Sequence, residues 1–375
     1  MRVVQVDAGR EWRGGQNQVR LLCRELAARA DVEVRLVTRR DSELARRAAA
    51  SAVPVAGVPW LLGPDPFAAI GLARVLTGFR PAVVHAHDAH ALTVARWAIR
   101  WSLGRASRPL LVATRHVDFR LRPWSAWFAA DCVIAISETV RQALVADGIP
   151  EHLLRVIPDG VDPAEIRRAA TAPLDVRRRL GLPAHTPLAV NLAALVDHKD
   201  QHTLLRAAAT ARALRPDLHW AIAGQGPLQR ELERTIAALA VGSHVHLLGY
   251  VEEGDALMRE ADVVVMSSKS EGLGTVVLNA LALGRPVVAT SAGGLAEIVP
   301  AAWRVPVGDA QALARRVVAA LDDPRPVPLP PRYTATAMAQ GVLEVYRGLL
   351  ESGPGAVNAV GAQHAAPLPP RFAAP

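Results

Sequence analysis

The sequence predicts an α/β protein built from two Rossmann-like domains that face each other across a deep cleft. Three observations lead to this fold class. The chain has 375 residues, which is more than one hydrophobic core usually serves. Short apolar runs alternate with longer segments at helical spacing, a pattern typical of a parallel, doubly wound sheet. The alternation is interrupted at the IPDGVD segment of residues 157–162 and then begins again.

The first half of the chain supplies the elements of one such sheet. Strands are predicted at residues 2–7, 32–38, 82–86, 110–114 and 132–137. Helices are predicted at residues 18–29, 66–78 and 92–103, where apolar residues recur at positions i, i+3 and i+4. These elements define an N-terminal domain over residues 1–165.

The second half repeats the alternation after a charged helix expected at residues 167–180. Strands are predicted at 188–193, 219–224, 244–248, 262–267 and 286–290, with helices at 200–214, 227–240 and 275–283. They define a C-terminal domain over residues 166–332. After a proline-rich connector at 324–331, a final helix at 335–350 is expected to pack back on the N-terminal domain. Residues 353–375 are rich in Ala, Pro and Gly without periodicity, which predicts a disordered tail.

The charge balance favours anionic partners. The net charge is +8, and almost every cation is an arginine because Lys199 and Lys269 are the only lysines. Phosphates, acidic glycans and acidic lipid headgroups suit such a chain. Nucleic acid is not expected, since neither zinc-finger spacing nor an RNA-binding aromatic signature is present. Frequent Ala and Arg beside scarce Lys indicates a GC-rich bacterial genome.

Cysteine usage and the N-terminus predict a cytoplasmic location. Cys23 and Cys132 each lie in an apolar segment, so buried free thiols in a reducing compartment are expected. The first residues read as a strand and lack the pattern of a signal peptide. No apolar run reaches the roughly 18 residues that a membrane span needs. The protein is therefore expected to be soluble, or attached at most to the inner face of the cytoplasmic membrane.

Two glycine-rich segments point to phosphate binding. Gly14 and Gly15 stand between the first strand and the first helix, where backbone amides suit a phosphate, although a plain turn explains them equally well. In the SKSEGLGTVV segment, Glu271 precedes Gly272, Leu273 and Gly274, and a helix begins at Thr275. Phosphates would bind the amides there, and sugar hydroxyls would bind the carboxylate.

Further candidates follow other strands of the second half. Lys199 lies after the first of them, where its charge could neutralise a diphosphate. Gly224 and Gly226 end another strand in a turn that suits close approach of a nucleotide base. The AGGLAE segment of residues 292–297 offers a further backbone-amide site.

The histidines are more ambiguous. VVHAHDAH (residues 83–90) and His116 each end a strand on the side of the expected cleft. His116 could be a polar group of the active site or a structural hydrogen-bonding residue. A metal site is not expected, because the spacing of known metal motifs is missing. The signatures of serine hydrolases and of dinucleotide-binding dehydrogenases are also missing.

Taken together, these motifs resemble the family 4 retaining glycosyltransferases of GT-B fold, from residue 1 to about residue 350. The resemblance is carried by WRGGQNQ, PAVVHAHD, DCVIAISETVRQAL, VIPDGVD, LAALVDHKD, AIAGQGPLQREL and SEGLGTVVLNALALGRPVVATSAGGLAEIV. It implies a donor-binding C-terminal domain and an acceptor-binding N-terminal domain. It also implies hexosyl transfer from a nucleotide-diphosphate sugar to a glycan or lipid-linked acceptor in cell-envelope polysaccharide or lipopolysaccharide synthesis, with no cofactor and no metal.

The same resemblance assigns roles to matching residues. Gly15 and Lys199 would contact the donor diphosphate from opposite sides, and Glu271 would hold the hydroxyls of the donor sugar. The amides of residues 272–275 would surround the sugar and phosphate, and His116 would lie near the anomeric centre. The departing diphosphate would help to deprotonate the acceptor, and the positive groups around it would stabilise the developing charge.

Two departures from the family pattern affect the site. The second of the family's paired glutamates, which normally binds the ribose, is Asn279 here. The arginine of the family's Gly-Arg pair falls on Ala194, so one diphosphate cation is missing unless Arg13 or Arg115 replaces it. A sugar-binding but inactive chain therefore stays an alternative. A nucleotide-sugar epimerase, which would use carboxylates close to the donor sugar as acid and base, is another.

Aromatic residues mixed with arginines raise a further alternative for the acceptor side. They are found at residues 59–62 and 119–128 and at Trp97 and Trp101. Such a mixture suits the headgroup level of an anionic bilayer. It suits equally well the half-buried packing residues of the first domain.

Overall fold

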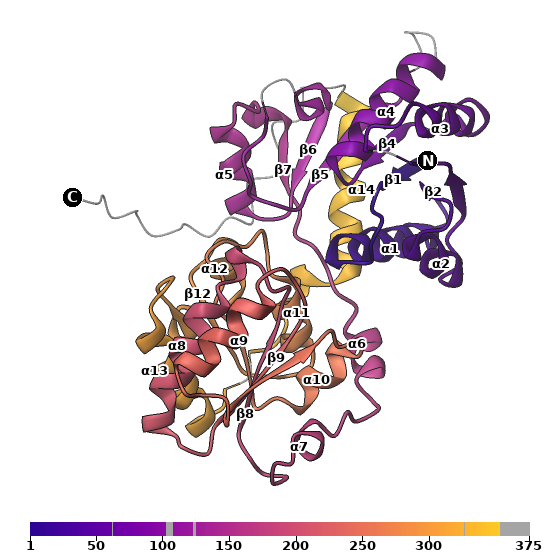
Figure 1. Cartoon of the computed structure of the whole chain (residues 1–375). Coiled ribbons are helices and arrows are strands. Elements are labelled where there is room, and N and C mark those ends of the chain that lie inside the picture. Colours follow the sequence, from indigo (N-terminus) through magenta and orange to yellow (C-terminus); the bar gives the residue numbers. More distant parts are fainter. Residues whose placement is uncertain (62, 103–107, 123–124, 326, 353–375) are drawn as a thin grey trace.

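The computed structural model describes residues 1–61, 63–102, 108–122, 125–325 and 327–352. Two parallel sheets covered by helices form two domains, drawn in purple above and in pink and orange below in Figure 1. This arrangement confirms the predicted fold class. The predicted tail at residues 353–375 lies outside the described residues.

The N-terminal sheet has the strand order β3-β2-β1-β4-β5-β6-β7. Its strands are β1 (Arg2–Val6), β2 (Glu33–Arg39), β3 (Val55–Val58), β4 (Val83–Ala86), β5 (Leu110–Arg115), β6 (Cys132–Ala135) and β7 (Leu154–Val156). The order reverses between β1 and β4. Ligands of open α/β sheets bind at such a reversal, outside the carboxyl ends of the strands.

Alternating side chains of these strands pack against helices on both faces, which is why they read as continuous apolar runs. Val3 and Val83 face one side, together with α1 (Gly14–Ala27) and α14 (Ala335–Ser352). Val4 and Val84 face the other side, together with α3 (Pro66–Phe79) and α4 (Ala89–Ser102). Smaller helices complete the domain: α2 (Glu43–Ala50), beside α1, and α5 (Glu138–Ala146), after β6.

The C-terminal sheet has the order β10-β9-β8-β11-β12-β13. Its strands are β8 (Leu188–Leu192), β9 (His219–Ala223), β10 (Val245–Gly249), β11 (Val263–Met266), β12 (Val287–Thr290) and β13 (Arg304–Val305). Its helices are α8 (Gln201–Leu214), α9 (Gln229–Ala238), α10 (Gly254–Glu260), α11 (Thr275–Ala282), α12 (Leu295–Ile298) and α13 (Ala310–Asp322). The order again reverses, between β8 and β11.

The segment that joins the domains differs from its prediction. Instead of one helix over residues 167–180, the chain forms α6 (Pro163–Ala169) and α7 (Val176–Arg179). Asp162 caps α6 by accepting the amides of residues 164 and 165, and Pro163 occupies its first turn, so the helix begins earlier than predicted. Pro173 disfavours helical geometry at the residue before it, which accounts for the interruption.

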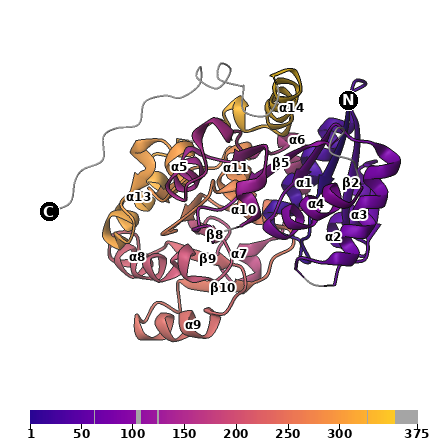
Figure 2. The ribbon, with the colours of Figure 1, turned by 90° about the horizontal axis from the view of Figure 1, so that it is seen from above.

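The last helix returns to the first domain (Figures 1 and 2). The isolated bridge between Val161 and Thr334 brings the connector back beside the junction of the domains. From there α14 runs along α1, and its Met338, Leu343 and Tyr346 enter the core beneath the N-terminal sheet.

Both cysteines and two of the tryptophans singled out in the sequence lie in the interior. Cys23 and Cys132 are buried free thiols, and burial raises the pKa of Cys132 to about 12. Trp60 and Trp127 are buried, so neither lies at a membrane-facing edge. None of the helices in the described part of the chain combines the length and the apolar composition needed to cross a bilayer.

Candidate active site

Two helix N-termini, one from each domain, face each other across the junction of the sheets. A Cβ atom added to Gly14, the first residue of α1, would lie 3.5 Å from Thr275 Oγ1 at the start of α11. A Cβ on Gly15 would have open space around it. No side chain of the described residues caps either helix at its N-cap position. The free amides and the positive dipole ends therefore converge on one region, which suits an anion.

Lys199 and Glu271 form an ion pair at this region. Lys199 Nζ lies beside Glu271 Oε2, and Ser268 Oγ donates to the same oxygen at 3.2 Å. Both side chains are largely buried, with relative exposures of 17% and 13%. The predicted diphosphate cation and the predicted sugar-binding carboxylate are thus neighbours, and each neutralises the charge of the other.

Two glycines hold the Glu271 loop in place. Gly294 N donates to the Glu271 carbonyl at 2.9 Å. Gly293 has a φ of +49°, and a Cβ there would lie 2.1 Å from that same carbonyl oxygen. Gly274 has a φ of +92°, which favours glycine at the start of α11. The glycines of the AGGLAE segment therefore support the loop. The sequence predicts a backbone-amide binding site in this segment, but the Gly294 amide already donates to the Glu271 carbonyl.

The same loop touches the N-terminal domain. A Cβ on Gly272 would lie 2.3 Å from the His116 carbonyl oxygen, and Ser137 Oγ donates to the Gly272 carbonyl at 2.6 Å. Ser270 Oγ donates to Asp118 at 2.6 Å. Leu273 points inward and is buried in the core. Only a residue without a side chain fits at position 272, because the two backbones approach so closely.

His116 follows β5 and is oriented by a carboxylate. Its Nδ1 lies 3.3 Å from Asp159 Oδ2, and the described residues offer its buried Nε2 no hydrogen-bond partner. Burial alone would lower the pKa of His116. The nearby charge and hydrogen bond of Asp159, together with the charges of Asp7 and Asp88, outweigh burial and raise that pKa.

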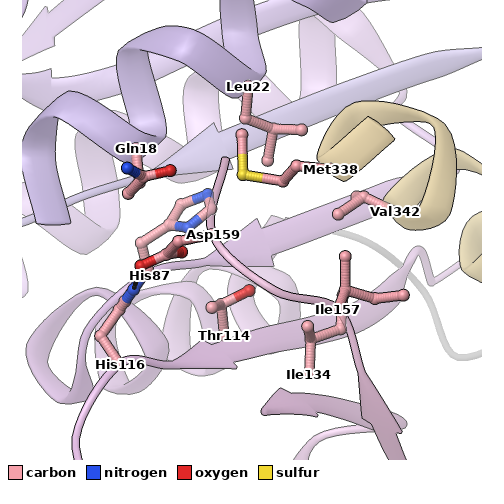
Figure 3. A pocket seen from close by; sticks show the side chains of 10 residues that line it. All are labelled: Gln18, Leu22, His87, Thr114, His116, Ile134, Ile157, Asp159, Met338 and Val342. Carbon is pink, nitrogen blue, oxygen red and sulfur yellow. Dashed lines mark hydrogen bonds and ion pairs between the residues drawn. The ribbon is translucent and has the colours of Figure 1, made fainter. Parts of the chain in front are cut away.

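The ring of His116 lines a small cavity between α1, β5 and α14 (Figure 3). The volume of about 20 Å³ holds roughly one water molecule. The ten lining residues are Gln18, Leu22, His87, Thr114, His116, Ile134, Ile157, Asp159, Met338 and Val342. The cavity is too small for a sugar, so it is not the donor site. It adjoins the imidazole of His116 inside the N-terminal domain.

A buried chain of polar groups, which the sequence did not predict, underlies this cavity. His87 Nε2 lies 2.7 Å from Gln5 Oε1, and Gln5 Nε2 donates to the hydroxyl of Tyr346 at 2.9 Å. That hydroxyl lies 2.5 Å from His85 Nδ1. Burial lowers the pKa of His85 to about 3 and also lowers the pKa of His87. These histidines of the VVHAHDAH motif are structural, and no group of acidic, His or Cys side chains within the described ranges is arranged to hold a metal.

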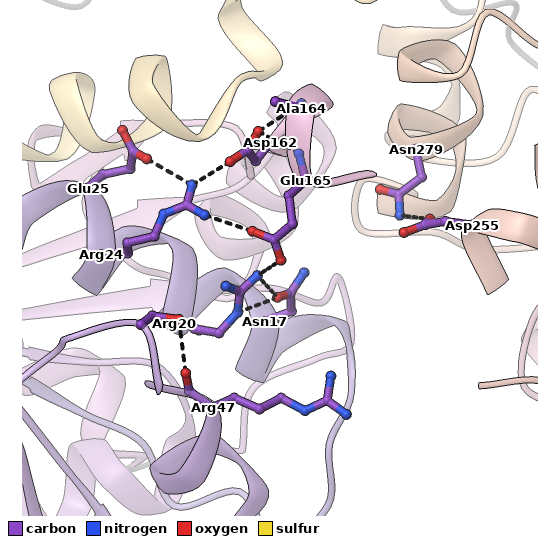
Figure 4. A network of polar contacts seen from close by, with 11 residues as sticks. Asn17, Arg20, Arg24, Glu25, Arg47, Asp162, Ala164, Glu165, Asp255 and Asn279 are labelled. Carbon is purple, nitrogen blue, oxygen red and sulfur yellow. Dashed lines mark hydrogen bonds and ion pairs between the residues drawn. The ribbon is translucent and has the colours of Figure 1, made fainter. Parts of the chain in front are cut away.

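Asn279, the expected nucleotide-binding residue, is paired with a carboxylate from the neighbouring helix (Figure 4). Its Nδ2 donates to Asp255 Oδ1 at 2.8 Å. Burial raises the pKa of Asp255, although the hydrogen bond from Asn279 opposes the shift. Asp255 comes from α10, more than twenty residues away in sequence, and no motif signalled it.

Gly224 and Gly226 have a packing reason of their own. A Cβ on Gly224 would lie 1.9 Å from the Ala193 carbonyl oxygen, and one on Gly226 would lie 2.3 Å from the Leu195 carbonyl oxygen. The close approach is therefore to the loop after β8. Arg13 and Arg115, the candidate replacements for the missing cation, are engaged elsewhere. Arg13 pairs with Glu11, while Arg115 donates to the Phe119 carbonyl.

Two carboxylates at the reversal between β1 and β4 were also not predicted. Asp7 Oδ1 accepts the Gly9 amide at 2.8 Å, and Asp88 Oδ2 accepts the Ala8 amide at 2.7 Å. Burial, together with the charge of Asp88, raises the pKa of Asp7 to about 7, although the Gly9 amide and Gln16 oppose the shift. Asp7 therefore changes charge near neutral pH.

One further carboxylate joins the two domains. Glu297 in α12 accepts the amides of Glu138 and Thr139, each at 3.1 Å, at the N-terminus of α5. Its own carbonyl accepts the hydroxyl of Tyr333 at 3.2 Å. Glu297 thus connects the C-terminal domain, the N-terminal domain and the connector before α14.

Comparison with known proteins matches both halves of the chain to family models. Residues 12–165 match the model described as Glycosyltransferase Family 4, and residues 175–338 match Glycosyl transferases group 1. The chain is 30% identical over 238 residues to the 2-deoxystreptamine glucosyltransferase of Streptomyces kanamyceticus, covering 60% of this chain and 58% of that protein. It is 36% identical over 179 residues to the GDP-mannose-dependent alpha-(1-6)-phosphatidylinositol monomannoside mannosyltransferase of Mycolicibacterium smegmatis, covering 45% and 47%. These matches span about half the length of the relatives.

Solved structures share the fold over nearly the whole chain. The Anabaena protein HepE in complex with UDP-glucose superposes with a TM-score of 0.72 at 22% identity, covering 94% of this chain and 98% of that one. A glycosyltransferase of Rickettsia africae superposes with a TM-score of 0.77 at 16% identity, covering 94% and 99%. The two family matches and the two-sheet topology agree, and the chain belongs to the family 4, group 1 glycosyltransferases.

Proposed function

We propose that the chain transfers a hexosyl group from a nucleotide-diphosphate sugar to an acceptor hydroxyl, with retention of anomeric configuration and without a metal. The observation that carries this proposal is the convergence of two uncapped helix N-termini with Lys199 and Glu271. Amides and an ammonium group together bind a diphosphate, and the carboxylate binds sugar hydroxyls.

The chemistry follows from where charge develops. As the bond from the anomeric carbon to the diphosphate breaks, negative charge grows on the phosphate oxygens. The amides of α1 and α11 and the Lys199 ammonium stabilise that charge without reorganising. A diphosphate would also draw Lys199 away from Glu271, which frees the carboxylate for the donor sugar at the moment of binding. His116, whose pKa is raised by the charge and hydrogen bond of Asp159, would lie beside the same region.

The Asn279–Asp255 pair is proposed to replace the missing ribose carboxylate. Asn279 contributes an uncharged amide, and Asp255 supplies the carboxylate from α10 at 2.8 Å. The Asp255 carboxylate can accept from one ribose hydroxyl, and the Asn279 side-chain amide can donate to the other.

The acceptor is proposed to be a glycan or a lipid-linked glycan of the cell envelope. Similar proteins include the mannosyltransferase named above and the lipopolysaccharide core biosynthesis glycosyltransferase LpsE of Rhizobium meliloti, to which the chain is 31% identical over 144 residues. Synthesis from nucleotide sugars would take place in the cytoplasm, and no cofactor is proposed.

Titration with a nucleoside diphosphate and with its free nucleoside tests the phosphate contacts. A charge-assisted contact contributes about 1.5–3 kcal/mol, so Lys199→Ala should weaken the diphosphate about 10- to 100-fold and the nucleoside much less. Lys269 is the matched control, because it is the other lysine and pairs with Asp197 on the surface. Equal losses for diphosphate and nucleoside would restrict Lys199 to a structural role.

The same titration separates the nucleoside end of the site. Asp255→Asn should weaken the free nucleoside about tenfold, since it removes one charged acceptor while keeping the shape of the side chain. Nucleoside affinity equal to that of the wild type would remove Asp255 from the site.

A further inference from the structure

The outer surface of α3 and α4 is unusually apolar for an exposed helix layer. The two helices pack side by side over one face of the N-terminal sheet (Figure 1). Three large apolar residues of this surface are exposed to solvent. Leu61, just before α3, is 68% exposed, Phe67 is 66% exposed and Trp101 is 52% exposed. Ile70 is also exposed, and the rings of Trp97 and Trp101 stack with centroids 6.2 Å apart. We call this surface, with the arginines described next, the α3–α4 face.

The charged residues of this face are all cations. The sequences PFAAIGLARVLTGF and AHALTVARWAIRWS contain Arg74, Arg96 and Arg100, all exposed, and neither contains Asp or Glu. The flanking carboxylates are occupied elsewhere. Asp65 is buried and accepts the amides of residues 67 and 68, while Asp88 accepts the Ala8 amide. Among the residues that the structure describes, the face therefore combines exposed apolar side chains with positive charge that no carboxylate of α3 or α4 compensates.

We propose that the α3–α4 face docks on an anionic lipid bilayer. Apolar and aromatic side chains enter the boundary between headgroups and acyl chains, and arginines meet the lipid phosphates. Both helices connect parallel strands of one sheet, so they run in the same direction. Phe67 at the start of α3 and Trp101 at the end of α4 then place rings at both ends of a surface about 20 Å long, and the helices lie flat on the membrane.

The positive charge of the α3–α4 face favours an anionic bilayer over a second copy of the chain as its binding partner. A symmetric dimer through this face would bring each arginine cluster against its own copy, and like charges disfavour that contact. Anionic headgroups offer the complementary charge. The inference goes beyond the proposed sugar transfer and does not depend on it, because binding to vesicles is measured without any donor or acceptor.

Flotation with vesicles tests the docking face on the full chain. The wild type should float with vesicles containing phosphatidylglycerol at about 50 mM salt, and much less at about 500 mM salt or with phosphatidylcholine alone. Each arginine near the surface contributes about fivefold, so Arg74→Ser, Arg96→Ser and Arg100→Ser combined should weaken partitioning about 100-fold. Phe67→Ser with Ile70→Ser should also reduce flotation at unchanged charge.

A matched triple variant separates this face from net charge alone. Arg230→Ser, Arg234→Ser and Arg315→Ser remove the same charge from exposed positions of α9 and α13 in the other domain. This control should float like the wild type, and all variants should keep the wild-type unfolding temperature. The proposal is overturned if the wild type ignores anionic vesicles at low salt. It is also overturned if the control loses as much as the α3–α4 variant, or if the face instead drives self-association in sedimentation without lipid.

Discussion

Asp7 illustrates how single residues of the junction are tuned by burial. Its carboxyl is buried at the reversal of the N-terminal sheet beside Asp88, and its pKa is raised to about 7. The unfolded chain ionises this group near its ordinary value of 3.8. Between these two values the folded state binds more protons than the unfolded state, so the contribution of Asp7 to stability falls as pH rises.

A comparison of Asp7→Asn with the wild type isolates this contribution. The asparagine keeps the shape and the acceptor for the Gly9 amide but cannot ionise. Its free energy of unfolding relative to the wild type should therefore increase as pH rises from about 5 to about 7.5. His85 and His87 are common to both chains and cancel in the difference. His116 does not cancel, because the charge of Asp7 helps to raise its pKa; in Asp7→Asn that pKa is raised less, which changes the difference in the same direction. Urea unfolding at both pH values measures it, and a difference independent of pH would contradict the raised pKa.

At the scale of elements, the N-terminus of α5 is completed from the other domain. Ser137 caps the helix by accepting the Val140 amide, and the Glu297 carboxylate accepts the amides of Glu138 and Thr139. A carboxylate at a helix N-terminus is favoured both by these donors and by the helix dipole. The helix therefore acts as a contact between domains as well as a cover for β6.

Glu297→Ala should loosen this contact. Loss of a helix-capping acceptor destabilises by about 1–2 kcal/mol, and here the loss falls on the connection between domains. We expect a lower unfolding temperature and a larger radius of gyration in solution scattering. Glu233→Ala, at an exposed acid of α9, serves as the control. Scattering and stability unchanged in Glu297→Ala would show that the contact does not hold the domains together.

How far the sequence leads also depends on scale. Periodicity and glycine turns were sufficient to predict the inner strands of both sheets and the loop from Glu271 to Thr275, because these are local patterns. The short edge strands β3, β7 and β13 were not predicted, since two to four residues are too few to show a pattern. The partners of these residues were not predictable. The pairing of Lys199 with Glu271, the support from Gly293 and Gly294, and the carboxylate of Asp255 beside Asn279 depend on contacts between distant segments. The prediction of a single helix at residues 167–180 was wrong because it followed the run of charged residues and did not take account of Pro173.

At the scale of the whole molecule, the two domains bring two helix N-termini, Lys199 and Glu271 together in one site. Donor turnover is the property that depends on all of these parts at once. In the absence of a known acceptor, water can accept the sugar slowly, and the anomeric form first released reports the stereochemistry.

Proton NMR of nucleotide-sugar turnover in the presence of EDTA is the most direct test. For at least one donor in a panel of nucleotide-diphosphate sugars, the wild type should release sugar of the same anomeric configuration as the donor, at a rate unaffected by EDTA. Glu271→Ala should reduce the rate at least about 100-fold, as removal of a group that stabilises the transition state does in other enzymes. Inversion of the anomer, a requirement for a divalent metal, release of an epimer, or binding of donors without turnover would contradict the account.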